Sequence, residues 1–438
     1  MTTPTKDELL TKMVNRRRAI DAELNGLAND IMVLANLDAL EPPVEPDIPE
    51  PPVEPEPPTP PVTGPDDYID VVVTANITQE ALATAISEAE PGTRFLVYGE
   101  LPMIRIGGQL GTAPKKEKYV AHHADHSPIE GITFQGANAD AGIAGLLFHN
   151  SLGGYDNVTF MDLAIRPRLD GDRACVMCEE HYREYKLQGG RITFDGIRLW
   201  APEDWQAWGG RGVKQAMAMR SSSITYSRMH FACAPQEHWI YDHNHQGPLV
   251  FDGLTGDTRI FKTPMGRTVE VGPGRAAIQI VERMTDGLES WGDVDISDVL
   301  VRRPSSEGVT NGLTASGAFP FTFTGTKGTI RMRDCRVDEP MTGGVMVAWT
   351  AGKGYRDPCI DRLDINGLSW VHGTGPEFAN RVPIKISAVG SVKARDVFET
   401  WHNAQTPNYL NAAWVDPRIK WNEDPSVHTI TPDLVDWA

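Results

Sequence analysis

The sequence repeats an eight-residue unit whose clearest copy runs from Ile192 to Leu199 and reads Ile-Thr-Phe-Asp-Gly-Ile-Arg-Leu. Apolar residues alternate with other residues on both sides of a polar or small pair, which is the pattern of two short strands that meet at a bend. Asp-Gly and related pairs favour such a bend because they tolerate left-handed backbone. Further copies begin at Ile132, Val158, Ile224, Leu249, Val294, Ile330, Leu363 and Val392.

The variable spacing of these copies, 25 to 45 residues, constrains the architecture. One unit is too small to bury its own apolar face, so neighbouring units must stack to complete a core. A propeller blade has a similar period but needs about four strands joined by hairpins, which the intervening segments do not provide. Coils of a parallel β-helix fit better, although Gly256, Ala394 and Glu399 stand where an apolar residue is expected. We expect one interior column to contain Ile132, Val158, Ile192 and Ile224.

The first coil has a recognisable start. A strand is expected at Ile69–Val73, a short amphipathic helix at Gln79–Ala89 and a second strand at Arg94–Tyr98, with Pro91-Gly92 ending the helix. Together with the nine repeats, this order resembles the pectin-lyase-like family of right-handed parallel β-helix proteins. The resemblance covers about residues 66–403 and implies a mainly β solenoid whose open end the helix covers. It indicates a fold rather than an activity, because this fold has many functions.

Residues 1–40 are predicted to contain an anchoring, coiled-coil-like α-helix. Its apolar residues follow a heptad seam, and a lone helix of this length is marginal in water, so the seam needs a partner. Residues 41–65 alternate proline and glutamate, which predicts an extended spacer rather than an SH3-type ligand. The tail, residues 404–438, lacks the repeat and should pack on the solenoid or on a neighbouring subunit. The seam consists of Leu10, Met13, Ile20, Leu24, Leu27, Ile31 and Leu34.

Composition excludes several classes of partner and ligand. The net charge of −18 argues against nucleic acid and anionic membranes, and the chain has neither an apolar run of about 18 residues nor a secretory apolar core. Cys175 and Cys178 form a single CxxC, which we interpret as buried thiols rather than a zinc site. We expect no metal and no cofactor. A second polar cluster, interpreted as a solvated loop, contains His122, His123, Asp125 and His126.

A tryptophan-rich segment is the first candidate for glycan binding. Exposed indoles stack on the apolar faces of sugar rings, and a guanidinium bonds hydroxyl groups. The alternative is that the indoles pack a long loop onto the coil, since large aromatic side chains contribute much burial energy wherever they lie. The candidate residues are Trp200, Trp205, Trp208 and Arg211.

The segment Glu237–Gly247 is the second candidate, and it resembles a His-x-x-Tyr strand found in many pectin-lyase-like proteins. Alternation predicts that His238, Ile240 and Asp242 lie on one face of the strand, opposite Trp239, Tyr241 and His243. Asp242 and His243 are candidate catalytic residues, because a histidine beside a carboxylate can move protons. His238 and Tyr241 are candidate glycan contacts. The alternative is a polar ladder on the coil surface.

A heptad helix, an acidic spacer and a β-helix together resemble a bacteriophage tailspike, head spike or fibre. The resemblance implies a homotrimer on the virion surface, made in the host cytoplasm, anchored to a tail or capsid protein through residues 1–40, and binding a host-surface polysaccharide. One alternative is a polysaccharide lyase or glycoside hydrolase, which would act on that polysaccharide. The other is a capsid decoration protein.

Overall fold

The computed structural model divides the chain into two units, Met1–Gly64 and Pro65–Ala438, and every described residue belongs to the second. The predicted anchoring helix and spacer therefore lie outside the described residues. The structure describes residues 68–107, 119–148, 153–167, 174–178, 190–199, 215–220, 223–232, 238–243, 245, 247–262, 268–273, 276–282, 290, 292–302, 320–338, 343–347, 360–372, 382–386, 389–401, 408–409 and 435–436.

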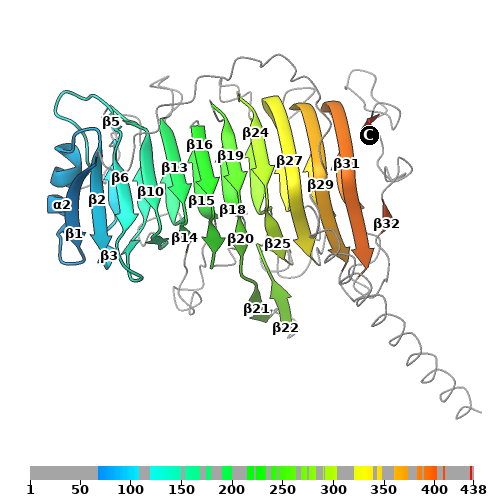
Figure 1. Cartoon of the computed structure of the whole chain (residues 1–438), viewed down its shortest axis with the longest axis horizontal. Coiled ribbons are helices and arrows are strands. Elements are labelled where there is room, and N and C mark those ends of the chain that lie inside the picture. The colour runs from blue at the N-terminus through cyan, green and yellow to red at the C-terminus, as the bar shows by residue number, and fades with distance from the viewer. Residues whose placement is uncertain are drawn as a thin grey trace, which may run out of the picture. The chain divides into compact units, whose positions relative to one another are not determined.

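The described chain is mainly β, as predicted, and most of its strands form three sheets whose pairings are parallel, except that β32 is antiparallel to β31 (Figure 1). Sheet A is the largest. Its main path is β1 (Ile69–Thr74), β2 (Thr93–Tyr98), β6 (Thr133–Gly136), β10 (Val158–Met161), β13 (Arg191–Asp195), β16 (Ser223–Ser227), β19 (Leu249–Asp252), β24 (Val294–Ser297), β27 (Thr326–Asp338), β29 (Ile360–His372), β31 (Val389–Trp401) and β32 (Asn408–Tyr409). β25 (Leu300–Arg302) pairs with β27, and β33 (Val435–Asp436) pairs with β31.

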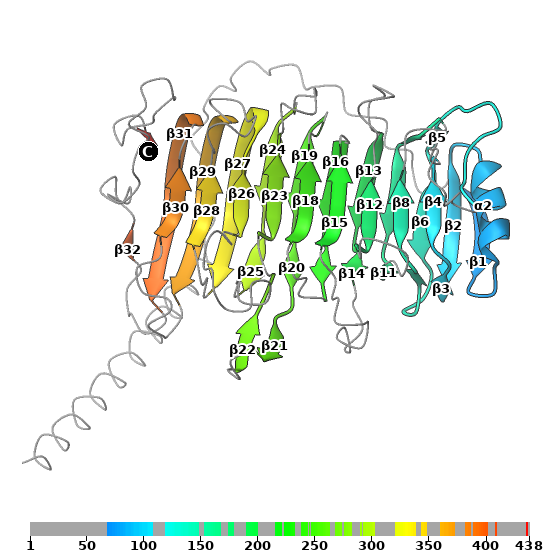
Figure 2. The same ribbon diagram turned by 180° about the vertical axis from the view of Figure 1, so that it is seen from behind.

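Two further parallel sheets accompany sheet A (Figures 1 and 2). Sheet B contains β3 (Glu100–Leu101), β7 (Gly142–Ile143), β11 (Ala164–Ile165), β14 (Arg198–Leu199), β17 (His230–Phe231) and β20 (Thr255–Gly256). Sheet C contains β4 (Ile104–Ile106), β8 (Leu146–Phe148), β12 (Val176–Cys178), β15 (Gln215–Arg220), β18 (His238–His243), β23 (Ile278–Val281), β26 (Phe321–Phe323), β28 (Gly343–Val347) and β30 (Val382–Ile386). Two small pairs complete the described strands: β5 (Ile129–Glu130) with β9 (Tyr155–Asp156), and β21 (Arg259–Lys262) with β22 (Thr268–Val271).

The chain visits the three large sheets in a repeating order. β2, β3 and β4 belong to sheets A, B and C, and the same order recurs in β6–β7–β8, β10–β11–β12, β13–β14–β15 and β16–β17–β18. Each strand pairs in parallel with the strand one repeat later. This order is compatible with a parallel β-helix. It differs from a propeller, whose blades are antiparallel sheets.

The nine sequence repeats occupy nine consecutive strands of sheet A, from β6 to β31. Val158, Ile192 and Ile224 are register partners, and Ile132, whose carbonyl accepts from the Thr159 N–H, continues the same column. All four side chains are buried, so the predicted interior column is confirmed. Each of these strands therefore contributes one apolar side chain to the core at the same position.

A second interior column consists of stacked aromatic rings. Phe95, Phe134, Phe160, Phe194, Tyr226 and Phe251 are all buried, and successive ring centroids lie 4.8, 5.1, 5.6, 5.8 and 4.8 Å apart. These distances suit offset stacking, which adds roughly 0.5–1.5 kcal/mol for each pair beyond the burial of area. Past β19 the same column continues with Ile296, Met332 and Ile365.

The bends that follow the sheet A strands adopt left-handed backbone, as the Asp-Gly pairs predicted. Gly196, Gly253 and Gly367 have φ values of 64°, 66° and 90°. Non-glycine residues occupy this conformation at the equivalent bends of other repeats, where it costs roughly 1–2 kcal/mol per residue. They are Asp162, Arg228, Asp298 and Asp334. The repeat therefore keeps its bend even where the sequence provides no glycine.

Helix α2 (Gln79–Ser87) lies beside β1 and β2 at the N-terminal end of sheet A (Figure 1). The Thr78 hydroxyl accepts a hydrogen bond from the Ala81 N–H at 3.1 Å, which caps the first turn. Leu82 and Ile86 are buried in the main core. The helix ends before the predicted Ala89, because the Ala89 N–H turns back to the Ile86 carbonyl instead of continuing the helical pattern.

Candidate functional site

The strand that carries the predicted catalytic pair lies in sheet C with its key side chains buried. In β18 the Asp242 side chain is 0 % exposed and His243 is 4 % exposed. Asp242 occupies an interior register position between Met219 and Ile280. A carboxylate without exposed surface cannot contact a polysaccharide in this conformation, so the described structure offers no support for Asp242 as the acid or base of such an enzyme.

Strand alternation is broken at the start of β18. Trp239 and Ile240 are consecutive, and both are buried in the core. The Trp239 ring stacks on Phe231 with 4.7 Å between centroids. A Cβ at Gly256 would lie 2.3 Å from Cζ2 of the indole, so the missing side chain of that imperfect repeat leaves the space that Trp239 fills.

Asp242 belongs to a buried polar network that joins three successive repeats. His245 Nδ1 lies 3.7 Å from Asp242 Oδ1, and His245 Nε2 lies 3.2 Å from Thr326 Oγ1. The Thr326 hydroxyl donates to the Gly292 carbonyl at 3.2 Å and therefore accepts from His245, which places a proton on Nε2. Burial lowers the pKa of His245 to about 4, against the opposing effect of the Gly292 carbonyl. Despite the nearby carboxylate, desolvation thus favours a neutral imidazole at neutral pH.

The outer face of sheet A presents a regular column of polar side chains. Threonines occupy its middle, in four consecutive strands, while aspartate and arginine alternate at its C-terminal end. From β2 to β29 the sequence neighbours of these residues are buried in the core, so the column faces away from the core; Thr133 is itself only 5 % exposed. From β1 to β29 the register partners are Asp70, Arg94, Thr133, Thr159, Thr193, Thr225, Val250, Asp295, Arg331 and Asp364, of which only Val250 is apolar.

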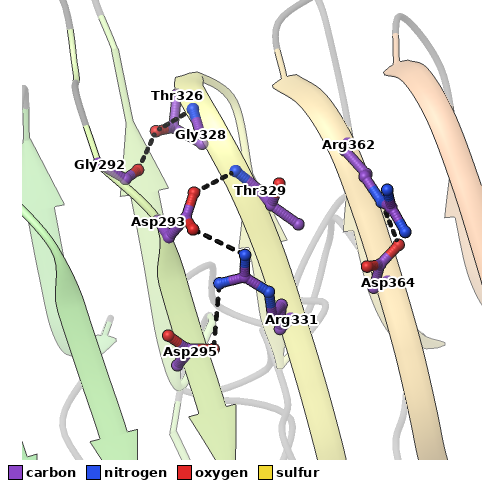
Figure 3. A network of polar contacts seen from close by, with 9 residues as sticks. All are labelled: Gly292, Asp293, Asp295, Thr326, Gly328, Thr329, Arg331, Arg362 and Asp364. Atoms are coloured by element: carbon purple, nitrogen blue, oxygen red, sulfur yellow. Dashed lines mark hydrogen bonds and ion pairs between the residues drawn. The ribbon is translucent and has the colours of Figure 1, made fainter. Parts of the chain in front are cut away.

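Arg331 is the centre of the charged end of this column (Figure 3). Its guanidinium lies 2.7 Å from Asp293 Oδ2 and 3.5 Å from Asp295 Oδ1, and its side chain is 41 % exposed. Asp293 also accepts the Thr329 N–H at 2.9 Å. Burial alone would raise the pKa of Asp293, but the Thr329 and Arg331 hydrogen bonds outweigh it and lower that pKa. Both the cation and this carboxylate therefore stay ionised at neutral pH while remaining open to solvent.

Similar ion pairs occur along the same sheet. Arg191 pairs with Asp156 at 2.8 Å, Arg228 with Asp195 at 2.7 Å, and Arg362 with Asp364 at 2.7 Å (Figure 3 for the last pair). The arginine hydrogen bonds lower the pKa of Asp156 and of Asp195. Ion pairs thus occur along both halves of sheet A, although Asp156 belongs to β9 and Arg228 to the bend after β16.

The other predicted residues have mixed outcomes. Tyr241 is partly exposed on β18, with its ring 5.3 Å from His238 and 6.2 Å from His243. Buried His238 contacts the Ala276 carbonyl through Nδ1 at 3.2 Å. The first glycan-binding candidates, Trp200, Trp205, Trp208 and Arg211, lie outside the described residues, as does the anchoring seam formed by Met13, Ile20, Leu24, Leu27, Ile31 and Leu34.

The predicted thiol and histidine clusters have ordinary structural contacts where they are described. Cys175 is buried in the core. His123 Nδ1 contacts the Ser87 carbonyl at 2.8 Å, which ties this loop to the end of α2. Within the described ranges there is no group of three or more His, Cys, Asp or Glu residues that could hold a metal ion. No helix in those ranges is long and apolar enough to cross a membrane.

Neither a protein-family model nor a curated protein matches this chain. Inferences about its function therefore rest on its own residues and on how its strands arrange them.

Proposed function

We propose that residues 66–403 close into a right-handed parallel β-helix of the pectin-lyase-like type, and that it is the exposed part of a bacteriophage spike or fibre that binds a host-surface polysaccharide. The recurring order of sheets A, B and C and the left-handed bends support the closed coil. The heptad seam in residues 1–40 and the proline-rich spacer support an anchored, homotrimeric assembly on the virion surface.

The outward column of sheet A carries the binding proposal. Adjacent strands lie about 4.8 Å apart, so the column offers hydrogen-bonding groups at a regular interval along the stack. A polysaccharide also presents hydroxyl groups at regular intervals. Asp295, Arg331 and Asp364 occupy successive strands of this column, and their carboxylates and guanidinium groups make charge-assisted hydrogen bonds to hydroxyls.

Binding fits this face better than glycosidic cleavage does. A glycoside hydrolase needs one carboxylic acid that holds its proton near neutral pH. The arginine-paired Asp156, Asp195 and Asp293 have lowered pKa values and are ionised there. Such groups accept hydrogen bonds from a sugar but do not protonate a leaving group.

The binding proposal is tested with the full chain on an array of bacterial capsular and O-antigen polysaccharides. Arg331→Ala should weaken binding to the recognised polysaccharide by about tenfold or more, which corresponds to about 1.4 kcal/mol. Arg336→Ala is the matched control, because Arg336 lies on the same strand beyond the Asp334 bend and also pairs with an aspartate, Asp338, at 2.6 Å. Equal losses for the two variants, or no binding by the wild-type chain, would contradict the proposal.

The anchoring proposal has a separate test. Deletion of residues 1–65 should leave a folded β domain that no longer joins its particle, because the seam that needs a partner is gone. Normal incorporation of the truncated chain into particles would rule out residues 1–40 as the anchor.

A further inference from the structure

An imidazole that is hydrogen-bonded to a hydroxyl lies within ion-pair distance of a carboxylate on the outer face of sheet B. His230 Nε2 is 3.3 Å from Asp257 Oδ2, and His230 Nδ1 is 3.1 Å from Thr255 Oγ1. His230 and Thr255 are register partners on β17 and β20, and Asp257 follows two residues after Thr255. The His230 side chain is 39 % exposed and that of Asp257 is 59 % exposed, so both are open to solvent, and Thr255 is half-buried beside them.

The hydrogen-bonding capacities of the three side chains indicate which atoms carry the protons. An ionised carboxylate can only accept a hydrogen bond, so the tautomer of a neutral His230 imidazole that Asp257 favours is the one with its proton on Nε2. Its Nδ1 then has a free electron pair and accepts the proton of the Thr255 hydroxyl. This is the order in which an oriented histidine activates a hydroxyl nucleophile, with the carboxylate holding the required tautomer.

A cation lies on the next strand. Arg198 of β14 is the register partner of His230 on the side opposite Thr255. It is exposed, and it has no ion-pair partner among the described residues. Adjacent strands are about 4.8 Å apart, so a carbonyl group that lies over His230 has a hydroxyl on one side and a guanidinium donor on the other. A guanidinium can stabilise the negative charge that develops on a carbonyl oxygen during attack.

We propose that Thr255, His230 and Asp257 form a catalytic site for the hydrolysis of small acyl esters, such as O-acetyl groups carried by a polymer. The site lies on an open sheet face, which suits an ester that projects from a long chain. This inference goes beyond the binding proposal and does not depend on it, because it concerns sheet B and a different chemistry.

The reaction balances with water as the only second reactant. Thr255 Oγ1 forms a bond to the acyl carbon while its proton passes to His230 Nδ1. The bond from the acyl carbon to the alcohol oxygen then breaks, and the leaving alkoxide takes the proton from Nδ1. Water attacks the acyl-threonine and gives its proton to Nδ1, which returns it to Thr255 Oγ1 as the bond to the acyl carbon breaks. The products are one alcohol and one carboxylic acid.

The test measures hydrolysis of 4-nitrophenyl acetate by the full-length protein. We expect saturable turnover whose kcat/KM falls about 100-fold or more in His230→Asn and in Thr255→Val, consistent with the usual contribution of a general base. Asp257→Asn should also lose activity, because the amide can stabilise the wrong tautomer, whereas Thr255→Ser should retain it. His126→Asn is the control for an exposed histidine elsewhere, and asparagine tolerates the left-handed backbone at that position (φ 59°).

Two results would overturn the proposal. One is hydrolysis by the wild-type protein no faster than by His230→Asn at equal concentration, with both proteins folded by circular dichroism. The other is loss of activity in His230→Asn with full activity in Thr255→Val, because histidine would then act without the threonine nucleophile. Equal loss in His126→Asn counts as the first result, since it marks unspecific catalysis by surface imidazoles.

Discussion

The two halves of sheet A stack their strands with different side chains in the core and on the outer face. From β6 to β19, aromatic rings stack inside and threonines occupy the outward column as far as β16, and left-handed bends follow β10, β13, β16 and β19. From β24 to β29 the interior column becomes aliphatic or Met, and charges alternate outside. There β27, β29 and β31 also run on through the bend as 13-residue strands. Both halves carry surface ion pairs, but charged side chains occupy the outward column itself from β24 onward, where a ligand can use them.

The largest expected effect concerns the two interiors. Phe194→Ala removes a fully buried ring that stacks on both Phe160 and Tyr226, and should lower the free energy of unfolding by about 3–5 kcal/mol. Met332→Ala, in the same column of the second half, should cost less, because it removes no stacked pair. Chemical denaturation of the two variants measures the difference. A larger loss for Met332→Ala would break the comparison.

Acid should weaken the junction between the halves, where His245 contacts Thr326 of β27. The pKa of His245 is lowered from 6.5 to about 4, mainly by burial. Between these values the unfolded chain binds more protons than the folded chain, so stability is complete above about pH 6.5 and declines as the pH falls to about 4. The loss is on the order of 3 kcal/mol. The free energy of unfolding, measured by chemical denaturation across this pH range, should depend less on pH in His245→Gln than in the wild-type protein. An unchanged pH dependence would show that His245 is not the cause.

Glycine bends should also distinguish the halves. A Cβ at Gly253 would meet only Arg228 backbone atoms at 3.7 Å. Gly253→Ala should therefore lower the free energy of unfolding only by the cost of left-handed backbone, about 1–2 kcal/mol. At Gly367 the added Cβ would lie 2.9 Å from the Asp334 backbone nitrogen, so Gly367→Ala should cost more. Thermal unfolding of both variants tests this order. Equal losses would mean that the second half relaxes around the extra atom.

The last expected effect concerns adsorption rather than stability, at the tryptophan candidates. Trp205→Ala should weaken polysaccharide adsorption at least about tenfold if its indole stacks on a sugar, since such contacts contribute on the order of 2 kcal/mol at a hot spot. An indole that packs the loop would instead lower the melting temperature without changing adsorption per folded molecule. Measuring both quantities on one variant separates these outcomes.

The strands of sheet A could be predicted from the sequence repeat, but the buried polar network around Asp242 could not. Alternation grouped Asp242 with Ile240, and the structure puts both inside. That grouping did not predict burial, because an aspartate is rarely tolerated in an apolar column. Its neighbours His245 and Thr326 are 81 residues apart, a separation that no local pattern covers. The Trp239 position was also unpredictable, because it depends on the space that Gly256 leaves one strand away in another sheet.

The His230 group had a different obstacle. Its three residues belong to two repeats, and only the pairing of β17 with β20 brings His230 beside Thr255. A useful signal was available, since both residues occupy the outward position next to an interior residue of their repeats. Aligning the repeats in register before searching for polar clusters would have found this group.

The structure of the complex with the recognised polysaccharide tests the central claim most directly. We predict that the sugar chain lies along the outer face of sheet A over β24, β27 and β29, with hydroxyl groups within hydrogen-bonding distance of Asp295, Arg331 and Asp364. A sugar chain bound elsewhere on the protein, with no contact to Arg331 and with its ion pairs unchanged, would contradict the account.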